Sequence, residues 1–190
     1  MKTILLAAGT ALACFLLLSP AMAQPAPAAA QTCDRCHGGG DAPRLNGQKA
    51  GYILARLKYF ARAAGRGRHG TFDMAGALAA LDDAGRRDLA RHYESQPPTE
   101  ARPGPLAAQG ERIYNKGIPA RKVLACALCH GARAEGHDDT PRLAGQHADY
   151  LKRQMSLFGL SWRWNELMHN TTQELKGAQI DALASYLAND

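Results

Sequence analysis

Beyond its first 23 residues, the sequence lacks any apolar run long enough to cross a lipid bilayer. The first 23 residues start with a lysine at position 2, continue apolar from Ile4 to Leu18, a run too short for a comfortable membrane span, and end in small residues at 21–23. A charged start, a short apolar core and an A-x-A-like site are typical of a secretory signal peptide. We therefore expect residues 1–23 to be removed on export and the mature chain to begin at Gln24.

The sequence also lacks a segment in which charge of one sign gathers. Its 23 Lys and Arg residues exceed its 17 Asp and Glu residues, and the formal charge is +6 at pH 7. A basic composition can indicate an acidic partner, an anionic membrane or a nucleic acid. Because the positive residues are scattered and follow an export signal, we expect no nucleic acid, and a solvated surface suited to transient docking.

Cysteine is scarce, with five residues in the chain, and four of them fall in two copies of one pentapeptide. The copies are CDRCH at 33–37 and CALCH at 126–130. C-x-x-C-H is the attachment motif of a c-type haem, in which both thiols become thioethers and the histidine binds the iron. The sequence therefore predicts two covalent haem c groups. The residues that would hold them are Cys33, Cys36 and His37 in the first half, and Cys126, Cys129 and His130 in the second.

Other uses of the cysteines are conceivable. Two C-x-x-C disulfides or one four-thiolate zinc site would use the same residues, but the histidine after each second cysteine argues against both. The fifth cysteine, Cys14, lies in the leader, where lipid acylation or an uncleaved anchor is the alternative to cleavage. The context of Cys14 fits an acylation site poorly. With four cysteines used by haem, no thiol is left for a disulfide.

The sequence that follows each motif is also repeated in the two halves of the chain. Each motif is followed by a P-R-L-x-G-Q hexapeptide, at 43–48 and 141–146, which leads into a segment headed by Tyr52 or Tyr150. The last segments of the two halves, which begin at methionines 74 and 168, align without a gap. Their apolar residues recur at the three- and four-residue spacing of a helix. An internal duplication of an all-α unit explains this pattern.

A proline-rich stretch without apolar periodicity separates the halves at residues 97–105. We predict a first haem domain at 24–96 and a second at 106–190. Each is too small to bury much apolar surface alone, and a porphyrin would supply that surface. The second domain has a candidate leading helix at 106–116, whereas two prolines at 24–32 discourage one in the first.

The sixth iron ligand decides between an electron carrier and an open catalytic site. Met74 lies 41 residues after the first haem cysteine, and Met168 lies 42 residues after its counterpart. This equivalent spacing predicts that both methionines bind iron, because thioether sulfur favours the ferrous state and saturates the site. His69 and His169 are the alternative ligands, although neither has a counterpart in the other half. Met155 is interpreted as a core residue.

Two shared residue pairs suit supporting roles at the haems. A proximal imidazole needs a hydrogen bond from its second nitrogen, and a backbone carbonyl at the rigid Pro43 or Pro141 could accept it. The guanidinium groups of Arg44 and Arg142 match the geometry of haem propionates. The alternative for both arginines is a solvent-exposed charge.

With these motifs the chain resembles the cytochrome c4 family, the two-haem members of the class I cytochromes c. The resemblance rests on the two C-x-x-C-H-G motifs, the two hexapeptides, the Tyr-headed helices and the two methionines, and it covers nearly all of the mature chain. It implies two tandem all-α class I domains with neighbouring haems, and histidines bonded to the proline carbonyls. The ligand pairs it implies are His37 with Met74 and His130 with Met168.

The first half departs from the family pattern. Its leading helix is missing or very short, and the segment after His37 is contracted. We expect more of the first haem edge to be exposed, and therefore a lower potential and a looser fold for the first domain.

The function that follows is electron transfer, with no substrate chemistry in the chain itself. The protein would act in the periplasm, in part at the inner membrane surface, between a respiratory or dehydrogenase donor and a terminal oxidase or reductase. One alternative is the cytochrome subunit of a periplasmic dehydrogenase, in which the partner is permanent. The other is a dihaem peroxidase, which would need one iron with an open position.

Overall fold

The computed structural model describes residues 26–39, 42–63, 72–163 and 165–189, and these form helices and loops without a β-strand. The predicted signal peptide and the candidate ligand His69 lie outside the described residues. No helix in this part of the chain is long and apolar enough to span a membrane.

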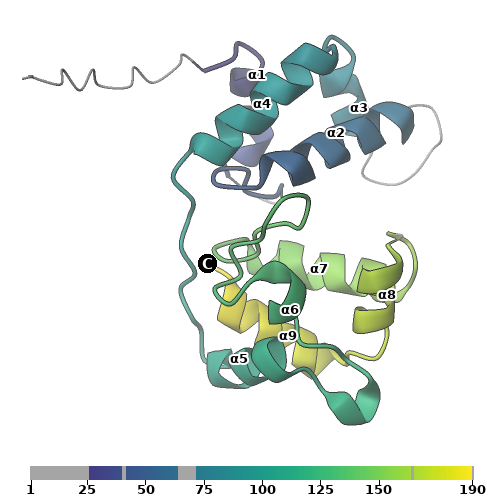
Figure 1. The fold of residues 1–190 in the computed structure, drawn as a ribbon. Helices are drawn as coiled ribbons and strands as arrows, with labels where there is room; N and C mark the ends of the chain where they lie inside the picture. The colour runs from purple at the N-terminus through teal and green to yellow at the C-terminus, as the bar shows by residue number, and fades with distance from the viewer. Residues whose placement is uncertain (1–25, 40–41, 64–71, 164, 190) are drawn as a thin grey trace, which may run out of the picture.

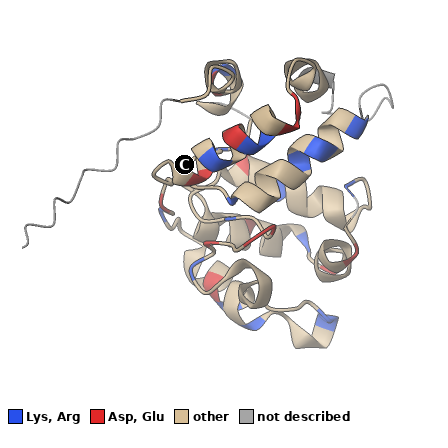
Figure 2. Cartoon of the chain, turned by 45° about the horizontal axis from the view of Figure 1, so that its top comes forward, with Lys and Arg blue, Asp and Glu red and all other residues tan. Residues whose placement is uncertain are grey.

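The helices form two lobes, one above the other in Figure 1, which are joined by a segment that runs down one side. The first lobe holds α1 (Ala30–His37), α2 (Ala50–Ala63), α3 (Phe72–Leu78) and α4 (Asp83–Ser95). The second lobe holds α5 (Ala107–Lys116), a 3₁₀ turn (Pro119–Arg121), α6 (Ala127–His130), α7 (Ala148–Gly159), α8 (Glu166–Thr172) and α9 (Gly177–Leu187). Basic and acidic residues are mixed over both lobes, as the sequence predicted (Figure 2).

The two lobes repeat one arrangement, in which α2, α3 and α4 correspond to α7, α8 and α9. Leu89 in α4 and Leu183 in α9 are each 1% exposed, at the centres of two separate cores. The internal duplication aligns these two leucines, so they occupy equivalent positions in the two lobes. Met155 packs against the second core, so its interpretation as a core residue is correct. The helical spacing of the apolar residues therefore predicted both cores.

The two lobes differ at their leading helices. In the second lobe α5 crosses α9 so closely that a side chain on Gly110 would lie 2.0 Å from the carbonyl oxygen of Ala182. In the first lobe the described residues before Ala30 are not helical. There the hydroxyl of Tyr93 donates to Oδ1 of Asp34 at 2.9 Å and ties α4 to α1. The described residues before Ala30 thus agree with the predicted difference between the two halves.

The segment that joins the lobes is held between the two hexapeptides. Gly47 has a φ of +70°, and a side chain there would meet Pro98 at 2.4 Å. Gly145 has a φ of +76°, and a side chain there would lie 1.8 Å from the carbonyl oxygen of Thr99. Both positions need a left-handed backbone and a close approach, which glycine alone allows without strain. Residues 97–105 are irregular, as predicted, but they pack against the two hexapeptides.

The hexapeptides also bind each other directly. Oε1 of Gln48 accepts from the backbone N–H of Arg142 at 2.7 Å, and its Nε2 donates to the carbonyl of Arg142 at 3.0 Å. Gln146 does the same to Arg44, at 2.9 Å and 3.1 Å. Both glutamine side chains are buried. This reciprocal contact holds the lobes together, and the sequence analysis did not predict it.

Replacing Gln48 by alanine should weaken the docking of the lobes by about 2 kcal/mol, at roughly 1 kcal/mol for each hydrogen bond lost. Proteolysis within residues 97–105 should then become faster, because cleavage follows the population of the opened form. The matched control is Gln109→Ala on the exposed face of α5. Equal cleavage rates in the two variants would show that the reciprocal contact contributes nothing to docking.

Candidate haem sites

Each lobe holds two motif cysteines, which lie one helical turn apart. Cys33 and Cys36 are in α1, and Cys126 caps the short helix that holds Cys129. Residues three apart on a helix face the same side. The first cysteine of each pair is partly buried and the second is exposed.

The thiol pairs do not suit the alternative of a zinc site. They belong to different lobes, and within the described ranges no three His, Cys, Asp or Glu side chains converge on a metal-sized site. A pair of thiols on one helical turn, with the histidine directly after it, fits thioether attachment of a haem in each lobe.

Each motif histidine is oriented by the proline carbonyl that the sequence indicated. Nδ1 of His37 lies 2.7 Å from the carbonyl oxygen of Pro43, and Nδ1 of His130 lies 2.9 Å from that of Pro141. A carbonyl only accepts, so Nδ1 carries the proton and Nε2 offers its lone pair. Burial lowers the pKa of His130, which favours the neutral, metal-binding form. The donor atoms thus fit a haem iron in both lobes.

The two candidate methionines lie in short helices that are separate from the final helices, a break that the helical spacing of these segments did not predict. Met74 in α3 packs against the first core. Met168 is in α8, where its backbone N–H donates to the capping side chain of Asn165 at 3.0 Å. The rival residue His169 has its Nδ1 within 3.0 Å of the carbonyl oxygen of Phe158, at the end of α7. The histidine therefore links two helices.

Large apolar side chains are exposed beside the second site. Leu128 lies within the haem motif and is 74% exposed, and Leu167, next to Met168, is 70% exposed. Others near these two segments are Leu124, Leu160 and Trp162. Exposed apolar side chains in both segments that carry the proposed iron ligands suit contact with a porphyrin.

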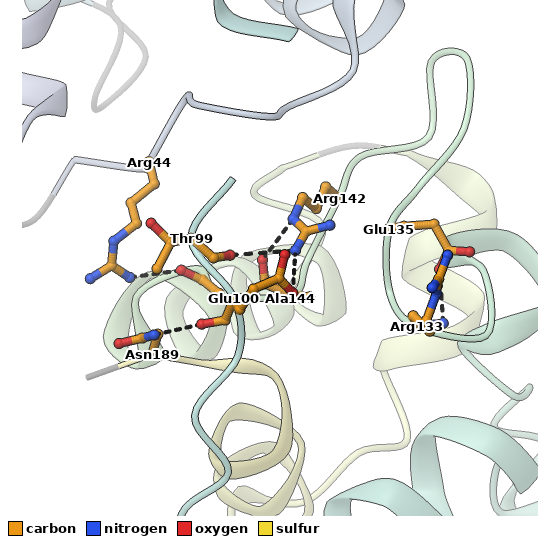
Figure 3. Close-up of polar contacts among 9 residues, drawn as sticks. Arg44, Thr99, Glu100, Arg133, Glu135, Arg142, Ala144 and Asn189 are labelled. Carbon is orange, nitrogen blue, oxygen red and sulfur yellow. Dashed lines mark hydrogen bonds and ion pairs between the residues drawn. The ribbon is translucent and has the colours of Figure 1, made fainter. Parts of the chain in front are cut away.

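The side chain of Arg44 contacts the other lobe, and that of Arg142 contacts the joining segment. Nη1 of Arg44 donates to the carbonyl of Gly145 at 2.8 Å (Figure 3). Arg142 donates to the carbonyl of Ala144 at 3.2 Å and pairs with Glu100 of the joining segment at 3.2 Å. The alternative of a purely solvent-exposed charge does not describe Arg142, whose side chain is 12% exposed. Contact of either arginine with a propionate stays a prediction.

Known proteins are similar to this chain over most of its length. The family model for cytochrome c matches residues 107–189. Cytochrome c4 of Azotobacter vinelandii is 33% identical over 177 residues, which are 83% of this chain and 84% of that protein. The chain belongs to the cytochrome c4 family.

Two further likenesses extend this assignment. The structure of the Acidithiobacillus ferrooxidans cytochrome c4 superposes with a TM-score of 0.77 and 31% identity, over 84% of this chain and 98% of that one. The thiosulfate dehydrogenase electron acceptor of Thiomonas intermedia is 32% identical over 186 residues, 90% of this chain and 83% of that protein. The predicted all-α class, the haem c cofactors and the electron-transfer function of a dihaem cytochrome c4 are confirmed.

Proposed function

We propose that this cytochrome c4 is a periplasmic carrier that receives and passes on single electrons and performs no substrate chemistry of its own. The observation that carries the proposal is the pair of His Nδ1 to proline carbonyl hydrogen bonds, one in each lobe, at 2.7 Å and 2.9 Å. Such a bond fixes the imidazole and makes it a stronger iron ligand. The proposed ligand pairs are His37 with Met74 and His130 with Met168.

The haem iron supplies the one-electron chemistry when it is bound. The residues of the chain hold it in place and keep water away. The half-buried Met74 and Met168 would close the sixth position in each lobe, and thioether ligation favours the reduced iron. Saturated coordination disfavours the peroxidase alternative, because peroxide would need an open position.

The partners that we propose are redox proteins, with a periplasmic dehydrogenase as donor and a terminal oxidase or reductase as acceptor. The relative from Thiomonas intermedia, named as an electron acceptor of thiosulfate dehydrogenase, supports a sulfur-compound dehydrogenase as one donor. A permanent subunit of such an enzyme is the second candidate. The mixed surface charge in Figure 2 favours transient docking instead.

The proposal is tested by the visible spectrum and haem content of the purified protein. We expect two haems per chain, both low-spin, with the weak methionine-to-ferric-iron band at the strength of two irons. A high-spin component, or a methionine-to-iron band with the intensity of a single iron, would contradict methionine ligation in one lobe. Either result would favour the alternative of a dihaem peroxidase. Reduction by thiosulfate with catalytic thiosulfate dehydrogenase then tests the donor, and a partner that co-purifies would favour the permanent subunit.

A further inference from the structure

An arginine of the second lobe reaches into the first. Arg163 lies in the loop between α7 and α8, and its Nη2 donates to the hydroxyl of Tyr52 in α2 at 2.9 Å. Its Nη1 donates to Oε1 of Gln154, and its guanidinium lies 4.5 Å from the ring centroid of Phe158. The loop is therefore held in place against the first lobe by the cation.

Two tyrosines in equivalent positions lie near this cation. Tyr52 and Tyr150 are each the third residue of the helix that follows a hexapeptide, and the hydroxyl of Tyr52 accepts the hydrogen bond from Arg163. Burial raises the pKa of Tyr150 to about 12, so its hydroxyl is neutral at physiological pH. A neutral phenol provides a hydrogen-bonding group but does not neutralise the arginine.

A second cation lies beside the first. Arg56 is one turn after Tyr52 in α2, and its guanidinium stacks 4.4 Å from the ring centroid of Tyr59. Burial and then the charge of Arg163 lower the pKa of Arg56. Among the described residues, no carboxylate forms an ion pair with either guanidinium. Two half-buried like charges without an anion are costly, so the cluster needs a negative partner.

We propose that Arg163, together with Arg56, Tyr52 and Tyr150, forms a carboxylate site shared by the two lobes, and that haem propionates occupy it. The site rests on the haem positions proposed above. A guanidinium fork matches a carboxylate in geometry and charge, and the phenol hydroxyls can donate to the remaining oxygens.

The positions in the chain agree with this occupant. Tyr52 follows the hexapeptide whose Pro43 holds His37, and Arg163 precedes Met168 by five residues, a reach of at most about 18 Å. One guanidinium thus adjoins the segments proposed to bind both irons. Because a nearby cation favours the reduced iron, a single residue of the second lobe sets part of the potential of both haems.

The test is a redox titration of holoprotein with Arg163→Gln, which removes the charge but keeps a polar side chain. Both potentials should fall, and the propionate-bending bands in the resonance Raman spectrum should shift. Arg163→Lys should restore part of the change in potential. The matched control is Arg112→Gln on the exposed face of α5, which should move neither potential nor band.

Unchanged potentials, or a change at one haem only, would overturn the shared site. If Arg163→Gln does not mature, Tyr52→Phe gives the same test, because it removes one hydroxyl on the first lobe and should still shift the Raman bands. The haem potentials of the unsubstituted protein could instead change with added phosphate, and this dependence could be lost in Arg163→Gln. That result would assign the site to a soluble anion and overturn the proposal that propionates occupy it. Fewer than two haems per unsubstituted chain would instead refute the proposed function.

Discussion

Replacing Met168 by alanine should lower the reduction potential of one haem by ~0.2 V or more, a sizeable part of the roughly 0.8 V that axial ligands span. The thioether stabilises ferrous iron, so its loss favours the ferric state and leaves a position that water can fill. That iron should become high-spin, and half of the methionine-to-iron band should disappear. Met74→Ala should do the same to the other haem. Spectroelectrochemical titration measures both effects.

The control for this prediction is Met155→Ala. This methionine packs against the second core, so its loss should cost about 2 kcal/mol or more of stability and leave the spectrum unchanged. If Met168→Ala stays low-spin with an unchanged potential, and His169→Ala does not, the histidine is the ligand.

Met74→Ala and Met168→Ala also show which haem has which reduction potential. His37 is half-buried, whereas His130 is 7% exposed. Greater access of water stabilises the more charged ferric centre, so Met74→Ala should remove the component of lower potential. Loss of the higher component would contradict the link between the missing leading helix and the potential of the first haem.

Replacing Gly110 by alanine should lower the free energy of unfolding of the second lobe by about 3 kcal/mol, near the upper end of the usual cost of overpacking. The new methyl group would lie 2.0 Å from the carbonyl oxygen of Ala182 and 2.7 Å from Cβ of Tyr186. Both atoms belong to α9, and the carbonyl is backbone, so no side chain can rotate away. The two helices would have to separate, which would open the core around Tyr114, a residue with 0% exposure.

Gly177→Ala is the matched control, because it lies in α9 and a methyl group there would have no atom within 4 Å. Alanine should be neutral there, or stabilise the helix by about 0.5 kcal/mol. Urea unfolding of the holoprotein, followed by circular dichroism, compares the two. An equal effect of both substitutions would mean that α5 and α9 are not in backbone contact.

The parts of the molecule that sequence reasoning predicted are those encoded by short stretches of chain. The thiol pairs, the histidine after each, and the proline carbonyl within eleven residues of it depend on local geometry. The leading helix at 107–116 and both cores follow from apolar spacing. The division of each last segment into a short helix and a final helix, α3 with α4 and α8 with α9, was missed because seven residues hold too few turns for a periodic pattern of their own.

The contacts between lobes were missed for a different reason. The partner of Gln48 lies 94 residues away, and that of Tyr52 lies 111 residues away. Such pairings depend on how two folded lobes are oriented, which no local pattern records. A glutamine repeated at the end of both hexapeptides was the available signal, since a buried polar side chain needs a partner.

The reciprocal glutamine contact has the geometry of an isologous dimer, in which one patch on each partner meets the same patch on the other. Each hexapeptide presents a glutamine side chain and an arginine backbone, so each half of the chain carries both sides of the contact. The tandem protein is thus built like two protomers covalently joined. Such a join makes pairing independent of protein concentration, and it leaves the two protomers free to diverge at their haems.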